Sequence, residues 1–159
     1  MYSVKIVAVG KLKESFLLEG CKEYLKRLSG YCKVEMLEAE EEKLPESPGE
    51  ALIAAALEVE AERIFQKTKG SLLIALCIEG EKVKSETLSK KLDQYGLQGK
   101  SNIAFVIGSS HGLSKRLKEA ADFKLSMSDM TFPHQMARLM LCEQIYRAFT
   151  IMAGSKYHK

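Results

Sequence analysis

The sequence lacks several features that would assign it to a special class of protein. No apolar run approaches the roughly 18 residues that a membrane-spanning helix needs. The first residues enter a strand pattern without the apolar core of a signal peptide. The cysteines are widely spaced and form no Cys-x-x-Cys pair, which argues against a zinc site or a disulfide framework. We therefore expect a cytoplasmic protein that holds no metal and does not associate with a membrane.

The common nucleotide-binding motifs are also missing. The loop from Gly108 to Gly112 follows an apolar run, as a nucleotide-binding loop would, but it is neither a Gly-x-Gly-x-x-Gly fingerprint nor a P-loop. A tight turn between a strand and a helix would use two glycines as well. Taken alone, this loop leaves ligand binding and a purely structural turn open as alternatives.

The composition is that of an ordinary globular protein. The 159 residues are 46% hydrophobic and 28% charged, and this length suits a single domain that spans residues 1–159. The charge is uneven, because residues 1–99 carry 15 basic and 17 acidic side chains whereas residues 100–159 carry 9 and 4. A basic C-terminal third suits an anionic partner such as RNA, although chance asymmetry explains it equally well.

Strand-like and helix-like segments alternate along the chain. Apolar runs predict strands at residues 4–9, 34–37, 71–78, 103–107 and 123–127. Helical periodicity or helix-forming composition predicts helices at residues 14–29, 50–69, 85–95, 114–121 and 134–153. This order predicts an α/β fold with a parallel-rich sheet flanked by helices. Such sheets bind ligands at the carboxyl ends of their strands, where we expect loops at residues 79–81, 108–112 and 128–133.

The last predicted helix is apolar over more of its circumference than one core-facing stripe requires. Either its own domain or a second subunit covers the additional face. Glu143 and Arg147 are spaced i, i+4 on this helix, so a surface ion pair is the simplest interpretation of Arg147. We interpret His134 and Cys77 as structural residues.

Two polar segments flank the last predicted helix, and each has a structural and a functional interpretation. Residues 126–133 supply either helix-capping hydroxyls or backbone groups that read an adenine edge. The C-terminal Tyr157-His158 pair, flanked by Lys156 and Lys159, is either a frayed end or a docking element for a base and its phosphates.

Several short motifs acquire a meaning when they are taken together. They are Val7-Ala8-Val9-Gly10, the strand end at Leu76, Gly108-x-x-x-Gly112-Leu113-Ser114, Leu125-Ser126, Met130-Thr131-Phe132-Pro133-His134-Gln135, Tyr146-Arg147-Ala148 and Tyr157-His158-Lys159. In this combination the chain resembles, over its whole length, the ribosomal RNA large subunit methyltransferase H family of SPOUT methyltransferases. It departs from the family pattern at Ser109, where members usually have glycine, and at His111, where they commonly have an acidic residue or asparagine.

The resemblance implies a fold, a cofactor and a substrate. The fold would be an α/β knot with a C-terminal trefoil knot, assembled as a homodimer, and the methyl donor would be S-adenosylmethionine. The implied substrate is a pseudouridine in helix 69 of 23S rRNA, methylated at its N3 nitrogen on assembled ribosomes. The implied cofactor-binding residues are Leu76, Gly108, Met127, Ser128, Asp129, Met130, Thr131 and Phe132. Arg147, Tyr157 and His158 are implied for substrate binding and catalysis.

The residue types agree with that chemistry. An imide N3–H must lose its proton as the nitrogen attacks a sulfonium methyl group, and histidine is suited to assist near neutral pH. An arginine can stabilise negative charge on the neighbouring carbonyl oxygens. We further expect Gly108 to leave room for the ligand, the last helix to form the dimer, and the tail to complete the partner's site. The alternatives are an RNA- or ribosome-binding knotted protein without transfer activity and, more distantly, a nucleotide-binding module with no RNA role.

Overall fold

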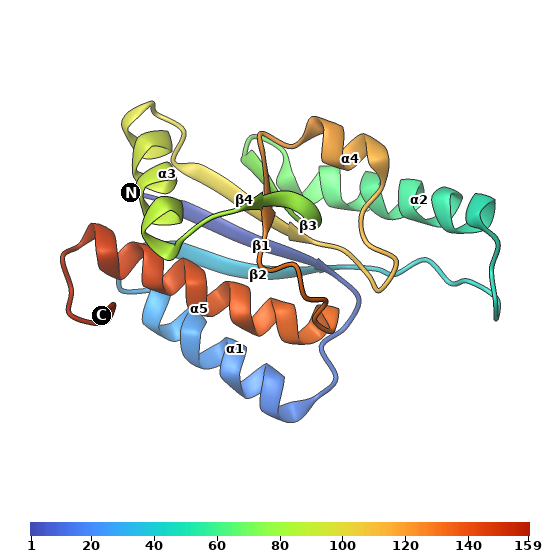
Figure 1. Ribbon diagram of the computed structural model, residues 1–159, viewed down its shortest axis with the longest axis horizontal. Coiled ribbons are helices and arrows are strands. Elements are labelled where there is room, and N and C mark those ends of the chain that lie inside the picture. Colours follow the sequence, from blue (N-terminus) through green and yellow to red (C-terminus); the bar gives the residue numbers. More distant parts are fainter.

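The computed structural model describes residues 1–159, and its elements alternate as the sequence predicts (Figure 1). The strands are β1 (Ser3–Val9), β2 (Lys33–Ala39), β3 (Leu72–Lys82), β4 (Asn102–Ile107) and β5 (Phe123–Ser126). The helices are α1 (Ser15–Leu28), α2 (Glu50–Thr68), α3 (Ser85–Leu97), α4 (Lys115–Ala120) and α5 (His134–Met152). All strand pairs are parallel, in the order β2-β1-β4-β3-β5. The predicted parallel sheet flanked by helices is confirmed, whereas the knot stays a prediction.

Helices cover both faces of the sheet, and the core is therefore divided in two. On β4, Ile103, Phe105 and Ile107 belong to the cluster that includes residues of α1, α3 and α5. Ala104 and Val106 point to the opposite face and belong to the cluster under α2 and α4. Because successive side chains of a strand alternate between faces, a strand covered on both sides must be apolar at every position. This requirement explains the near-continuous apolar runs of β3 and β4.

Helix α5 lies in front of the sheet and packs between α1 and α3 (Figure 1). Packing within the subunit therefore covers much of its apolar surface, and a second subunit over the remaining part stays a prediction. Met136 is the one large hydrophobic residue of α5 that is exposed, at 38%. Although α5 is apolar, neither it nor any other helix is long and apolar enough to cross a bilayer.

The predicted end of β3 is wrong, because the strand continues through Glu79-Gly80-Glu81 to Lys82. Two parts of β3 pair with β5, residues 74–76 and residues 81–82. The residues between these two parts form an irregular bulge. A Cβ atom on Gly80 would lie 2.7 Å from the carbonyl carbon of Leu125. Gly80 therefore lies where the backbones of β3 and β5 approach closely, in a segment that the sequence analysis predicted to be a loop.

Candidate functional site

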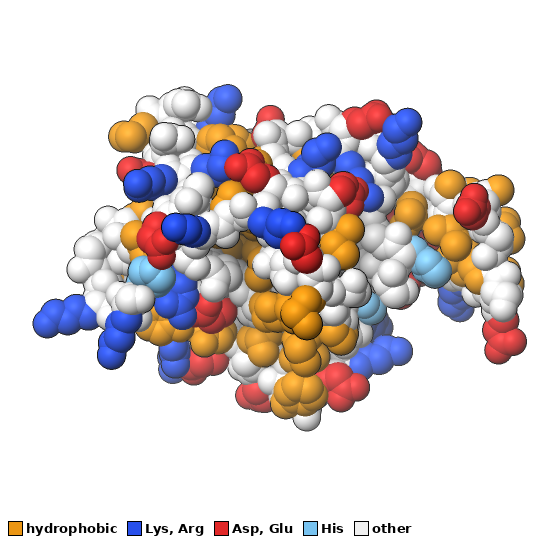
Figure 2. Space-filling model, in the orientation of Figure 1, with side chains coloured by type: hydrophobic (Ala, Val, Ile, Leu, Met, Phe, Trp, Pro, Cys, Tyr) orange, Lys and Arg blue, Asp and Glu red, His pale blue; other side chains and the backbone are white.

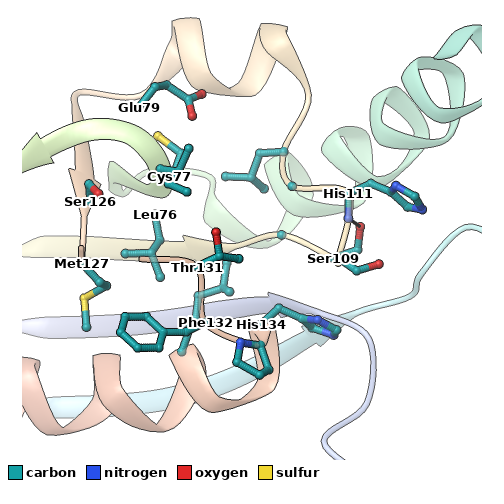
Figure 3. Close-up of a pocket in the computed structure, with 18 of the residues that line it drawn as sticks. Leu76, Cys77, Glu79, Ser109, His111, Ser126, Met127, Thr131, Phe132 and His134 are labelled. Atoms are coloured by element: carbon teal, nitrogen blue, oxygen red, sulfur yellow. Dashed lines mark hydrogen bonds between the residues drawn. The ribbon is translucent and has the colours of Figure 1, made fainter. Parts of the chain in front are cut away.

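A cavity of about 670 Å³ opens beside the bulge of β3 and at the carboxyl ends of β4 and β5 (Figure 3). Its walls come from the bulged part of β3, from the segments that follow β4 and β5, from Lys118 of α4 and from the first turn of α5. The first three of these are residues 76–79, 107–113 and 126–133. The volume lies within the range of small-molecule sites, and the position is the one where open α/β sheets bind ligands.

The structure brings together most of the residues that the sequence assigned to cofactor binding. Seven of the eight line this cavity, namely Leu76, Gly108, Met127, Ser128, Met130, Thr131 and Phe132. Leu76 and Thr131 lie near its centre in Figure 3, between Met127 on one side and His134 on the other. Asp129 does not line the cavity, because its side chain is 83% exposed and forms an ion pair with Lys82.

The turn between Gly108 and Gly112 is held by its own backbone. The N–H of Gly112 donates to the carbonyl oxygen of Ser109 at 2.9 Å, and Gly112 adopts a φ of +84° that glycine tolerates. A Cβ atom on Gly108 would lie 2.2 Å from the carbonyl oxygen of Gly112. The glycine at 108 therefore serves the closure of the turn, not the space for a ligand that we expected.

The departure from the family pattern at Ser109 costs no backbone strain. Ser47 is the only non-glycine residue with a positive φ, so Ser109 has an ordinary backbone conformation. Its side chain is buried, and its Oγ accepts a hydrogen bond from the N–H of His111 at 3.3 Å. His111 lies at the side of the cavity where His134 is also found (Figure 3).

The segment from Met127 to Pro133 combines internal hydrogen bonds with free backbone groups. The hydroxyl of Ser126 donates to the carbonyl oxygen of Ser128 at 3.1 Å, and the hydroxyl of Ser128 accepts from the N–H of Met130 at 3.0 Å. The N–H groups of Thr131 and Phe132 make no hydrogen bond within the protein. The serine hydroxyls thus shape the loop, and backbone donors stay available to a ligand.

Sequence reasoning missed several titratable side chains of this cavity. Glu79 lies 2.5 Å from Lys118, and this contact lowers the pKa of the Glu79 carboxyl. Burial raises the pKa of the Cys77 thiol, so no thiolate nucleophile is present near neutral pH. Cys77 and Glu79 come shortly after Leu76, where the apolar run of β3 ends, and this position was the signal that could have identified them. No group of three or more His, Cys, Asp or Glu side chains is placed to hold a metal ion.

The predicted catalytic residues form a second cluster, away from the cavity. Glu143 accepts hydrogen bonds from Arg147 Nη2 at 2.8 Å, from Arg147 Nε at 3.3 Å and from the Tyr157 hydroxyl at 2.7 Å. The Tyr157 ring packs edge-on against Tyr146, with centroids 4.7 Å apart. The expected ion pair of Arg147 is present, but it belongs to a larger network that docks the C-terminal tail instead of leaving it frayed.

His158 lies between two charged side chains of the same subunit. Its Nδ1 atom is 3.1 Å from Arg147 Nη1, and its Nε2 atom is 2.5 Å from Oε1 of Glu86, near the start of α3. Burial, and then the hydrogen bond to Glu143, raise the pKa of Tyr157. The hydrogen bond to Glu143 also raises the pKa of Arg147. Near neutral pH the cluster therefore contains a neutral phenol and a fixed cation.

The two clusters occupy opposite ends of α5. The helix begins at the cavity and carries Arg147 thirteen residues after His134, which corresponds to roughly 20 Å at 1.5 Å per residue. In Figure 1 the tail turns back after α5, and the C-terminus lies beside the far end of the helix. None of Arg147, Tyr157 and His158 lines the cavity. The predicted site thus has two parts that do not meet within one subunit.

Comparison with known proteins gives consistent matches along the whole chain. A family model described as "Predicted SPOUT methyltransferase" matches residues 2–158. The chain is 48% identical over 157 residues to the ribosomal RNA large subunit methyltransferase H of Acetivibrio thermocellus, covering 98% of this chain and 99% of that protein. It is 45% identical over 157 residues to the protein of the same name from Enterococcus faecalis, with the same two coverages.

Solved structures with a similar fold are more distant in sequence. A probable methylase family protein from Haemophilus influenzae aligns with a TM-score of 0.57 at 18% identity, over 98% of this chain and 70% of that one. The tRNA (m1G37) methyltransferase from Aquifex aeolicus aligns with a TM-score of 0.54 at 14% identity, over 91% and 69% of the two chains. These structures support the assignment of the fold.

Proposed function

This chain belongs to the SPOUT methyltransferase family, and we propose that it transfers a methyl group from S-adenosylmethionine to the N3 nitrogen of a pseudouridine in helix 69 of 23S rRNA, on assembled ribosomes. The observation that carries the proposal is the ligand-sized cavity beside the β3 bulge and the ends of β4 and β5, lined by seven of the eight residues assigned to the cofactor. The names of the full-length relatives support rRNA as the substrate.

The cavity is chemically suited to S-adenosylmethionine. Apolar side chains such as Leu76, Ile107 and Phe132 suit the faces of an adenine ring, and the free N–H groups of Thr131 and Phe132 suit its polar edge. The protonated Cys77 offers no nucleophile that would compete for the methyl group. When bound, S-adenosylmethionine supplies an activated methyl group and a neutral thioether leaving group.

The tail cluster is suited to the substrate. Arg147 carries a fixed positive charge and can donate to a carbonyl oxygen of the target base. Ordering a backbone residue costs about 1–2 kcal/mol, so a short polar end stays docked only where its side chains have partners. Glu143 and Glu86 supply these partners here. They hold Tyr157 and His158 in place before any RNA arrives.

A homodimer would unite the two halves of the site. If α5 packs antiparallel to α5 of a second copy about a two-fold axis, the tail of each subunit approaches the cavity of the other. A stripe of hydrophobic side chains runs from the first turns of α5 to the start of α1, where Met136 and Phe16 are exposed (Figure 2). At the cavity, Ile78 and Met130 are 58% and 72% exposed. A partner subunit would cover such a surface.

One experiment tests the proposed function directly. The purified protein is incubated with methyl-labelled S-adenosylmethionine and with ribosomes whose helix 69 is unmethylated, and the 23S rRNA is then mapped by mass spectrometry. We expect one additional methyl group, on the N3 nitrogen of a pseudouridine in helix 69. Free 23S rRNA is the matched control and should be a poorer substrate. Cofactor and ribosome binding without transfer would favour the binding protein instead, and absence of cofactor binding would refute both.

A further inference from the structure

We propose that Glu86 fixes the tautomer of His158 and thereby makes Nδ1 of His158 the atom that accepts the imide proton during methyl transfer. This inference rests on the proposed function, and it adds Glu86, a residue from another part of the chain, to the proposed site. Glu86 lies in the first turn of α3, 72 positions before His158. It does not line the cofactor cavity, so it acts through His158 as a positioning residue.

The tautomer follows from the two neighbours of the His158 ring. Arginine has N–H donors and no acceptor, so the 3.1 Å contact of Arg147 Nη1 requires a lone pair on Nδ1. The ring hydrogen must then be on Nε2, which lies 2.5 Å from a carboxylate oxygen of Glu86. The two neighbours therefore select the same neutral form of the ring. A histidine that donates one N–H to a carboxylate keeps its other nitrogen available as a base.

The resulting pair of groups matches the edge of an imide. Arg147 presents an N–H donor and His158 presents an acceptor, 3.1 Å apart. An imide presents the complementary pattern, a carbonyl oxygen beside an N–H. Without substrate, Arg147 and His158 satisfy each other. A bound uracil-like base exchanges this single hydrogen bond for two, one from Arg147 to the carbonyl oxygen and one from the imide N–H to Nδ1.

The transfer step then balances in atoms and charge. The N3–H bond breaks and its proton goes to Nδ1 of His158, while the nitrogen electron pair forms the new bond to the methyl carbon. The bond from sulfur to the methyl carbon breaks, and its electron pair stays on sulfur. The positive charge passes from the sulfonium to the imidazolium, which Glu86 stabilises through the hydrogen bond at Nε2.

Glu86 is the only carboxylate bonded to this ring. Glu143 of α5 also belongs to the cluster, but its oxygens accept from Arg147, Tyr157 and Gln144. The charged and titratable groups in the hydrogen-bonded network of His158 are thus Glu86 from α3, Arg147 and Glu143 from α5, and Tyr157 from the tail itself. All of them belong to one subunit. A tail that serves the partner's cavity would carry its proton acceptor already oriented.

The tautomer can be measured without any activity. Long-range proton–nitrogen correlation spectra of the free protein should show Nδ1 of His158 as an acceptor nitrogen and Nε2 as an N–H nitrogen. In Glu86→Ala we expect the two nitrogen signals to move toward each other, whereas Glu86→Gln, whose amide oxygen can still accept, should stay near the wild type. Glu58→Gln is the control, because its partner Arg116 keeps Glu62. The opposite tautomer in the wild type would overturn the proposal.

Two further measurements separate positioning from a structural effect. Cross-relaxation between the rings of Tyr157 and Tyr146 reports whether the tail stays docked, and we expect it in all variants. Single-turnover methyl transfer should fall roughly 10–100-fold in Glu86→Ala, with partial recovery in Glu86→Gln. The dissociation constant for S-adenosylmethionine should change less than about two-fold, because Glu86 is outside the cavity.

The outcomes distinguish this inference from the function on which it rests. A transfer rate of Glu86→Ala within about two-fold of the wild type would refute Glu86 as a positioning residue. If the wild-type protein methylates no RNA, the proposed function is wrong, and the spectrum of His158 alone decides whether Glu86 sets the tautomer.

Discussion

The two ends of α5 are built on different principles. At its start, the cavity is formed by strand-end backbone and apolar side chains, and its charged pair Glu79–Lys118 is satisfied internally. At its other end, Arg147 of α5 and Tyr157 and His158 of the tail belong to a hydrogen-bonded cluster that lines no part of this cavity. The first region is suited to hold a ligand by shape, and the second to act on a substrate through side chains. The separation of roughly 20 Å means that neither end is a complete site within one subunit.

The largest effect should come from removing the second region. Deletion of Tyr157–Lys159 should lower methyl transfer at least about 100-fold, because it removes the proposed proton acceptor and the phenol held by Glu143. Cofactor affinity should not change, since no deleted residue lines the cavity. Single-turnover kinetics and calorimetric titration measure the two quantities, and deletion of Lys159 alone is the control. A parallel loss of cofactor binding would contradict the division of the site.

The same deletion shows whether the two ends meet across a dimer. Heterodimers are formed from a tail-deleted subunit and a Gly108→Val subunit with an intact tail. If the tail acts in trans, one complete site is restored, with the cavity of the first subunit and the tail of the second. If it acts in cis, neither site is complete. Activity no higher than that of the parent proteins, with heterodimers confirmed by mass, would refute the trans arrangement.

The cavity is tested by disturbing its backbone. Gly108→Val should weaken cofactor binding by about 100-fold, because the Cβ atom meets the carbonyl of Gly112 at 2.2 Å and displaces the turn. Ser109→Gly is the matched change in the same loop. Its effect should stay below about three-fold in affinity, since Ser109 already has an ordinary φ. Calorimetry measures both affinities, and equal affinities of the two variants would contradict a backbone-built cavity.

The difference between the two regions also explains what the sequence could predict. Apolar runs and helical periodicity predicted all five strands and all five helices, and the signal is clearest in β1, β3 and β4, which are buried on both faces of the sheet. The cavity residues came from a resemblance, since a backbone-built cavity has no fixed residue type. The bulge at Gly80 was missed because a loop glycine and a close backbone contact look identical in sequence.

The tail cluster shows a different limit of sequence reasoning. The i, i+4 spacing predicted the pair of Glu143 and Arg147, since both residues are on one helix. The contact of Glu86 with His158 could not be predicted, because it joins positions 72 residues apart and depends on how α3 and the tail meet in space. Long-range contacts between single side chains leave no periodic pattern in one sequence.

A moderate effect on methyl transfer is expected when Glu143, which binds Tyr157 of the tail, loses its charge. Glu143→Gln keeps the size of the side chain but removes the charge that holds Arg147 and Tyr157. Methyl transfer should fall about 10-fold, a typical effect of a supporting residue. Glu143 contributes to raising the pKa of Tyr157, so spectrophotometric titration of this phenol should show its pKa shifted downward in the variant. An unchanged titration would contradict the assigned hydrogen bond.

The smallest effect is expected at Asp129, where the resemblance and the geometry differ most. The resemblance assigns Asp129 to the cofactor, yet its side chain is 83% exposed and is paired with Lys82 outside the cavity. An exposed ion pair contributes about 0–1 kcal/mol, so Asp129→Asn should alter cofactor affinity less than about three-fold. Phe132→Ala, at a residue that lines the cavity, should weaken binding at least about 10-fold. A comparable loss in Asp129→Asn would mean that the carboxylate leaves Lys82 to contact the ligand, and that side-chain charge contributes to binding at the cavity end.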